Sequence, residues 1–342
     1  ATHLQATDPA WPPDGDEPFF DSGASYHRRP YGSIGQGHYA AAWEEFSSRI
    51  THERRFFDAG ATERLQDILG KDGSAESAAL PTLEIGPGRP HGLLFRARVA
   101  SSEQEALEMM GSPASQIGPP PVHMATAGRM NAAGISVFYG ALGVDTAIAE
   151  VRPTVGGLVV VAQFAPSRVL RLLDLTQIGN AFTGSIFADD YEDRVSRRQF
   201  LRGFHALVAR PVRPGEEAIA YVPTQAVAEF VVNVLGFDGI LFASVQVGAL
   251  EESDPWEEDL GLVYAPDARG TRELGDHNVV LLGAAGRVQQ ETTADNDALA
   301  QPGPPGLRYV DGTATLRRVT AIAFTHDEIY VPGFEEPGTP DF

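Results

Sequence analysis

Short apolar runs follow one another closely in the middle of the chain. Three short runs rich in β-branched residues and leucine predict strands at Ile135–Tyr139, Leu158–Phe164 and Val169–Leu173. Between the first two runs, a short helix is predicted over Thr146–Arg152, with Asp145 as its N-cap. The centre of the chain is therefore expected to fold as a small unit in which strands surround one helix.

Helical spacing dominates the N-terminal part. Apolar positions recur at near-helical spacing over Gly37–Ala59, Gly60 then marks a break, and a second helix is predicted over Ala61–Leu69. These helices would form a small helical N-terminal domain, residues 38–80. An extended arm rich in Pro, Gly, Asp and Ser is expected before it, over residues 1–37.

The second domain is predicted to span residues 81–330, with a loose tail at residues 331–342. A linker is expected over residues 71–92, and a half-buried strand at Leu93–Val99 follows it. An acidic insertion occupies residues 248–276. The other predicted elements are helices over Ser102–Met110, Tyr191–Val208 and Pro223–Leu235, strands at Ile240–Ala243 and Asn278–Leu282, and a β-hairpin of Leu307–Val310 and Thr315–Thr325.

Three polar side chains stand at marked positions of the central unit. Arg129 lies in the loop before the first strand, Tyr139 ends that strand, and Glu150 lies on the short helix. A guanidinium binds phosphate oxygens, an aromatic face attracts a cation, and a carboxylate stabilises positive charge. The combination suits an anionic substrate that carries a ring.

The motifs around these residues stand in a fixed order. They are GRMNAAG (Gly128–Gly134), VFY (Val137–Tyr139), TAIAEVRP (Thr146–Pro153), LRLLDLT (Leu170–Thr176), YVPTQAVAE (Tyr221–Glu229) and GFDGILFAS (Gly236–Ser244). Tyr139 follows Arg129 by ten residues, and Glu150 follows Tyr139 by eleven. With these blocks and spacings, the chain from Leu93 to Leu282 resembles the RES family, whose members are bacterial toxins that degrade NAD.

The resemblance implies a fold and an activity. The fold would be α+β, with the split mixed β-sheet of the ADP-ribosyltransferases and flanking helices, and the helical N-terminal domain resembles that of longer family members. The activity would be cleavage of the nicotinamide–ribose bond, so NAD is expected as a consumed substrate and no bound cofactor is expected. An antitoxin or immunity protein is an implied partner, and homo-oligomer formation stays open.

The resemblance also assigns roles to residues. It implies catalytic roles for Arg129, Tyr139, Glu150 and Ser244, and contacts of Arg96, Arg129, Tyr139 and Ser244 with NAD. Glu150 would stabilise the oxocarbenium-like transition state of N-glycoside cleavage, and Arg129 would clamp the pyrophosphate. Tyr139 would stack on nicotinamide or bond its ribose, and Ser244 would bond the ribose or orient Glu150.

Each of these side chains also has a purely structural interpretation. Asn131 is expected to shape its own loop rather than to touch a substrate. The alternatives for the others are a loop arginine that bonds carbonyls for Arg129, a core tyrosine for Tyr139, an exposed helix residue for Glu150, a cap or turn residue for Ser244, and a surface ion pair for Arg96.

Composition narrows the function classes. With 26 basic and 46 acidic residues, the formal net charge of −20 would repel a polyanion, so no nucleic-acid partner is expected. The chain has no cysteine, which excludes disulfides and thiolate metal sites and fits a reducing cytoplasm. The nine histidines show no ligand spacing, so no metal is expected.

Motifs that are absent narrow the function further. The sequence has no phosphate-binding P-loop motif and no strand–GxGxxG–helix unit, so a redox use of NAD is not supported. No run of about 18 apolar residues and no signal peptide is found, so no membrane contact is expected. We therefore expect NAD hydrolysis, with ADP-ribosyl transfer to a protein and a non-catalytic acidic binding module as the alternatives.

Overall fold

The computed structural model describes residues 37–56, 58–70, 80–179, 190–210, 212–213, 215–244, 246, 274–289 and 303–322. The predicted arm at residues 1–37, apart from Gly37, and the predicted tail at residues 331–342 lie outside the described residues. The acidic insertion also lies outside them, up to residue 273.

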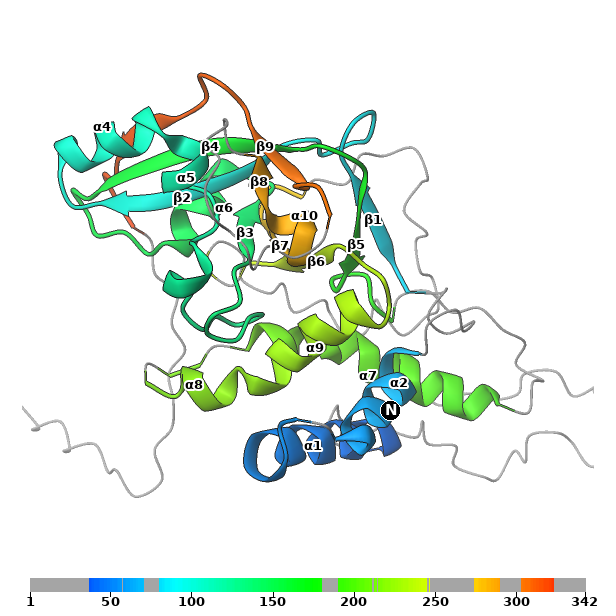
Figure 1. Ribbon diagram of the computed structural model, residues 1–342. Coiled ribbons are helices and arrows are strands. Elements are labelled where there is room, and N and C mark those ends of the chain that lie inside the picture. The colour runs from blue at the N-terminus through cyan, green and yellow to red at the C-terminus, as the bar shows by residue number, and fades with distance from the viewer. Residues whose placement is uncertain are drawn as a thin grey trace, which may run out of the picture.

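A mixed sheet forms the centre of the described part of the chain (Figure 1). Its ten strands follow the order β1-β5-β6-β7-β3-β2-β4-β9-β8, and β10 also pairs with β4. The pairs β5–β6 and β8–β9 are parallel, and the other pairs are antiparallel. The strands are β1 (Thr82–Ile85), β2 (Leu94–Ala100), β3 (Phe138–Ala141), β4 (Leu158–Pro166), β5 (Leu170–Asp174), β6 (Gly239–Ala243), β7 (His277–Leu281), β8 (Val288–Gln289), β9 (Leu307–Tyr309) and β10 (Thr315–Arg318).

Helices flank this sheet, and the two together confirm the predicted α+β fold. None of the helices in the described ranges combines the length and the apolar character that a membrane crossing requires. They are α1 (His38–Ser48), η1 (Arg49–Glu53), α2 (Ala59–Leu69), α4 (Glu103–Gly111), α5 (Pro113–Gln116), η2 (Val122–Met124), α6 (Val144–Glu150), α7 (Tyr191–Ala209), α8 (Glu217–Ala220), α9 (Val222–Asn233) and α10 (Gly283–Gly286).

Both faces of the sheet are covered. Consecutive residues of a strand point to opposite faces. Leu173 and Val280 pack with α1, α2, α7 and α9, whereas their neighbours Leu172 and Val279 pack with α4, α5 and α10. Helix α6 packs through Ala147 on β2 and β4, on the same side as α7 and α9. This side of the sheet therefore carries two groups of helices.

The N-terminal helices share one apolar core with α7 and α9 (Figure 1). The ring of Trp43 on α1 meets Phe204 on α7 edge to face, with 5.1 Å between the ring centroids. The Tyr39 hydroxyl donates a hydrogen bond to Asp193 on α7 (2.8 Å), and the Nε of Arg197 donates to the carbonyl of Ile68 on α2 (2.8 Å). The core is thus continuous across the domain boundary predicted at residue 80.

The predicted linker at residues 71–92 was wrong in part, because it contains strand β1. The pairing of β1 with β5 runs from Thr82 opposite Leu173 to Ile85 opposite Leu170. The four residues of β1 form an edge strand that is too short to show a period, so its tertiary partner β5 decides its structure.

The predicted hairpin near the C-terminal end was also wrong. Strands β9 and β10 do not pair with each other; both pair with β4, at Phe164–Pro166 and at Leu158–Val161 respectively. The turn residues Asp311 and Gly312 therefore connect two pieces of one edge rather than two antiparallel strands. The nine-residue β4 is long enough to take both partners on the same side.

Two helix boundaries differ from the predictions. Helix α6 begins after Gly143, so Asp145 lies in its first turn and caps nothing. A Cβ at Gly143 would lie 2.0 Å from the carbonyl oxygen of Gly275, so this N-cap position has room only for glycine. The break between the N-terminal helices lies before Asp58, whose carboxylate accepts hydrogen bonds from the N–H groups of Gly60 and Ala61.

Replacing Phe46 by alanine tests the shared core. Phe46 is 1% exposed, so we expect the free energy of unfolding to fall by about 3–5 kcal/mol, in a single transition of the whole chain. Phe56→Ala is the matched control, because Phe56 is 76% exposed. Chemical denaturation followed by circular dichroism and tryptophan fluorescence measures both variants. A separate transition of the N-terminal helices, with the rest unchanged, would contradict the shared core.

Candidate functional site

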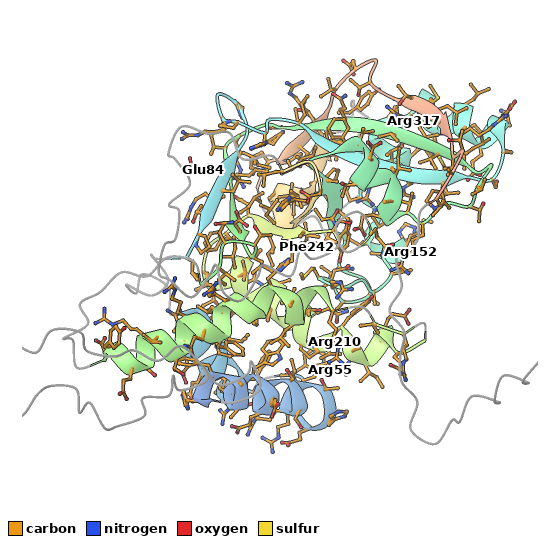
Figure 2. The ribbon with its side chains drawn as sticks, turned by 180° about the vertical axis from the view of Figure 1, so that it is seen from behind. Arg55, Glu84, Arg152, Arg210, Phe242 and Arg317 are labelled. Carbon is orange, nitrogen blue, oxygen red and sulfur yellow. The ribbon has the colours of Figure 1, made fainter. Side chains whose placement is uncertain are left out.

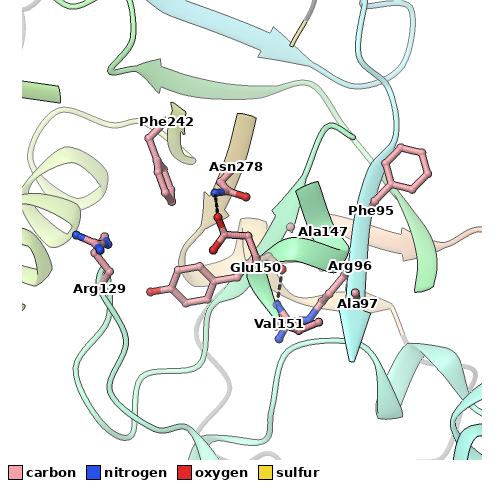
Figure 3. A pocket seen from close by; sticks show the side chains of 11 residues that line it. Phe95, Arg96, Ala97, Arg129, Ala147, Glu150, Val151, Phe242 and Asn278 are labelled. Atoms are coloured by element: carbon pink, nitrogen blue, oxygen red, sulfur yellow. Dashed lines mark hydrogen bonds between the residues drawn. The ribbon is translucent and has the colours of Figure 1, made fainter. Parts of the chain in front are cut away.

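A pocket of about 270 Å³ opens on the side of the sheet that carries α6 (Figure 3). Its walls come from β2, β3, β6 and β7, from the end of α6, and from the loop before β3. The lining residues are Phe95, Arg96, Ala97, Arg129, Tyr139, Gly140, Ala147, Glu150, Val151, Phe242 and Asn278. Three of the four residues predicted as catalytic thus line one pocket, and the fourth, Ser244, bonds to Glu150.

Glu150 is the acidic group of this pocket. It is the last residue of α6, and α6 is tied to the turn before β7 by a hydrogen bond from the Thr146 hydroxyl to the carbonyl of Gly275 (2.7 Å). Its carboxylate oxygen Oε1 accepts hydrogen bonds from Ser244 Oγ and from Asn278 Nδ2, both at 2.6 Å. The side chain is exposed, and its carboxylate points toward the side of the pocket where Phe242 and Arg129 lie (Figure 3).

The two donors to Glu150 are buried and come from neighbouring strands. Ser244 follows β6 and is 2% exposed, and Asn278 lies on β7 and is 5% exposed. The Ser244 hydroxyl oxygen accepts a hydrogen bond from the N–H of Gln246 (3.1 Å), which leaves its proton for Glu150. Hydrogen bonds to an ionised acceptor are stronger than neutral ones, so the pair fixes the carboxylate.

Arg129 both lines the pocket and bonds backbone carbonyls. Its Nη1 donates to the carbonyls of Val208 (2.8 Å) and Arg210 (2.9 Å) at the end of α7, where helix carbonyls lack intrahelical partners. The guanidinium also lies 5.1 Å from the centroid of the Tyr221 ring. The Thr224 hydroxyl on α9 donates to the Arg129 carbonyl. Arg129 thus bonds carbonyls, as its structural interpretation predicted, and it also lines the pocket.

Tyr139 presents its ring to the pocket while its hydroxyl is bonded in the loop before β3. The hydroxyl accepts from the N–H of Met130 and donates to Asn131 Oδ1, both at 2.9 Å. Burial raises the pKa of Tyr139 to about 12, so the phenol is neutral at physiological pH. As predicted, Asn131 shapes its own loop, because its amide donates to the carbonyls of Thr126, Ala132 and Ile135.

Arg96 occupies the place where β2 and β3 separate. These strands pair only through Phe95 and Ala141, and Arg96 Nη1 donates to the carbonyl of Tyr139 (2.6 Å) beyond that point. Its guanidinium lies 5.3 Å from the centroid of the Phe138 ring. Burial and the nearby Arg98 lower the pKa of Arg96. The described contacts of Arg96 are with a carbonyl and a ring, and they differ from the surface ion pair considered as its alternative.

The buried Nε of Arg96 has no hydrogen-bond partner among the described residues. A buried donor without a partner is costly, so this atom is an unfavourable feature of the packing between β2 and β3. Within the same described ranges, no group of three or more His, Asp or Glu side chains could hold a metal ion.

The sequence matches the model of one known domain family. The model of the RES domain matches residues 93–269, more than half of the 342-residue chain. The chain belongs to the RES domain family. No curated protein and no solved structure matches it. RES domains are associated with NAD-related toxin–antitoxin systems. Arg96, Arg129, Tyr139, Glu150 and Ser244 all lie within the matched RES domain, whereas β7 follows it.

Sequence reasoning assigned no role to two residues of this pocket. Asn278 was placed only as the first residue of a predicted strand, and Phe242 only inside another. Phe242 lies between the sheet and the helical layer (Figure 2). The available signal was a polar amide at the start of the apolar run NVVLL, because buried polar residues in strands need partners.

Replacing Gly128 by alanine tests the loop that holds Tyr139. The added Cβ would lie 2.6 Å from Asn131 Oδ1 and 2.8 Å from the Tyr139 hydroxyl oxygen. We expect the loop to shift and the free energy of unfolding to fall by about 1–3 kcal/mol. Gly111→Ala is the control, because a Cβ there meets nothing within 4 Å. Equal stability of both variants in urea unfolding would contradict this packing.

The raised pKa of Tyr139 gives a second prediction. The folded-state pKa of about 12 exceeds the unfolded value of about 10, so the neutral phenol stabilises the fold fully below pH ~10. That contribution, in total about 2–3 kcal/mol, is lost as the pH rises toward 12. Urea unfolding between pH 9 and 11 should show a smaller loss for Tyr139→Phe than for the unsubstituted chain. An identical loss of stability in both proteins would contradict the raised pKa of Tyr139.

Proposed function

We propose that this protein consumes NAD by cleaving the bond between nicotinamide and ribose. The observation that carries the proposal is the Glu150 carboxylate, held by Ser244 and Asn278 in a pocket that Arg129 and Tyr139 also line. In this pocket an acid, a guanidinium and an aromatic ring lie together. A guanidinium suits the anionic pyrophosphate of NAD, and an aromatic face and a carboxylate suit its cationic pyridinium ring.

The chemistry of the bond explains the need for a fixed carboxylate. Nicotinamide leaves as a neutral molecule and takes the electron pair of the C–N bond, so the positive charge moves from the ring nitrogen to the ribose. The transition state resembles an oxocarbenium ion, as in other glycoside cleavages. A carboxylate beside the ribose stabilises this charge more than it stabilises the substrate, which lowers the barrier. Glu150 is the group for this role.

The size of the pocket favours binding of one end of NAD. Its volume of about 270 Å³ is just below the range of ~300–1,000 Å³ that is common for ligand sites, and suits a ring with its sugar. The rings of Tyr139 and Phe242 offer faces to the cationic pyridinium. Arg129 uses Nη1 for carbonyls, and its other nitrogens suit the pyrophosphate. Arg96 adds a second positive charge at the opposite wall.

Two acceptors can capture the ribosyl cation. Attack by water releases a proton and gives ADP-ribose, and attack by a protein side chain gives ADP-ribosylated protein. Incubation of the full chain with NAD and a cell extract distinguishes the two outcomes, because free ADP-ribose indicates hydrolysis and a label on protein indicates transfer. Natively folded chain that yields neither product would contradict both activities and favour a binding module.

Replacing Glu150 by glutamine tests the catalytic role. Glutamine keeps the shape but removes the negative charge, so we expect the rate of nicotinamide release to fall by about 10²–10³-fold. Binding of NAD, measured by calorimetry, should change much less than the rate. Glu229→Gln on the exposed face of α9 is the matched control and should keep full activity. Full activity of Glu150→Gln would exclude this mechanism.

A further inference from the structure

The position of Asn278 is fixed by the strands on both sides of it. It lies on β7, which is hydrogen-bonded to β6 on one side and to β3 on the other. Its register partners are Phe242 on β6 and Ala141 on β3. The side chain is 5% exposed and its Nδ2 donates to Glu150 Oε1 at 2.6 Å. Two strand ladders therefore fix the position of this donor.

We propose that Asn278 is a positioning residue that, together with Ser244, fixes the rotation of the Glu150 carboxylate so that Oε2 faces the bound ribose. The role rests on the proposed cleavage of NAD. Asn278 lies beyond the part of the chain that the RES domain model matches.

The arrangement of the donors supports this role. The terminal torsion of a glutamate is broad, so a free carboxylate samples many rotations. A serine hydroxyl also rotates, whereas the amide of asparagine is planar and directs its N–H groups. Both donors bond the same oxygen, Oε1, and no described residue donates to Oε2. Asn278 is thus the more rigid of the two donors. Together, Ser244 and Asn278 form a clamp on Oε1, which leaves Oε2 for the substrate.

The chemical identity of the amide also matters. Asparagine donates a hydrogen bond without adding charge, so the negative charge in the pocket stays on Glu150. An aspartate at this position would be acceptor-only when ionised and would repel Glu150. The other charged or titratable groups that line the pocket are Arg96, Arg129 and Tyr139, and none of them is bonded to Glu150 in the described structure.

The test compares Asn278→Asp and Asn278→Ser with Asn233→Asp in the full chain. Asn233 is exposed at the end of α9 and outside the pocket, so Asn233→Asp adds the same charge elsewhere. For Asn278→Ser, whose hydroxyl is too short to reach, we expect kcat for nicotinamide release to fall about ten- to a hundredfold. KM for NAD should stay within about twofold, because the carboxylate acts mainly in the transition state.

Asn278→Asp has a distinct signature in its pH dependence. At neutral pH two carboxylates face each other and activity should be lost. As the pH falls, the pair binds one proton, the introduced carboxyl can donate to Glu150, and activity should partly return. The carbon-13 carboxyl signal of Glu150, identified by its loss in Glu150→Gln, should titrate at least about one pH unit higher than in Asn233→Asp. A residue that serves only stability would not reverse the pH profile.

The outcomes separate this inference from the proposed function. A wild-type chain that releases no nicotinamide, with a shifted Glu150 titration in Asn278→Asp, would reject NAD cleavage and support the clamp. An unshifted titration would reject the clamp whatever the activity. Wild-type kcat in folded Asn278→Ser would also overturn it. If Asn278→Asp does not fold, Asn278→Ser tests the role of Asn278 by itself. A fall in kcat with little change in KM would support the positioning role, whereas a rise in KM as large as the fall in kcat would indicate lost packing and reject it.

Discussion

The organisation of the pocket depends on one oxygen atom. Glu150 Oε1 accepts from a hydroxyl at the end of β6 and from an amide on β7, and these donors lie 94 and 128 residues away along the chain. The bonds form only when α6, β6 and β7 have all reached their places. The acid is therefore oriented by the assembled sheet and not by its own helix, which has only seven residues. An exposed glutamate at a helix end gains a defined direction in this way.

The second anchor of the pocket is α7. It packs against the N-terminal helices through Asp193, Arg197 and Phe204. The carbonyls at its C-terminal end hold Arg129. One helix thus contacts both the N-terminal segment and the arginine of the pocket. Because Arg129 satisfies carbonyls that the helix cannot satisfy internally, its position is stable before any ligand arrives.

The sequence predicted most of the inner strands, because their apolar runs are long enough to be recognised as buried strands. It failed where partners decide the structure. The edge strand β1 is too short to show a pattern, and its structure depends on pairing with β5. The Asp311–Gly312 turn can be read from the local sequence, but the pairing of both β9 and β10 with β4 is a tertiary contact that the sequence does not show. The motifs around Arg129, Tyr139 and Glu150 pointed to three side chains that line one pocket. The amide at the start of NVVLL signals a buried polar residue at Asn278, but its partner Glu150 lies 128 residues away and is not apparent from the sequence.

The apolar core that joins α1 and α2 to α7 and α9 limits how this architecture can be shortened. A version of the chain that began with the first strand of the RES domain would leave the rings of Phe200 and Phe204 and their neighbours in contact with water. A chain shortened in this way would need more polar side chains on α7 and α9, or another polypeptide to cover them.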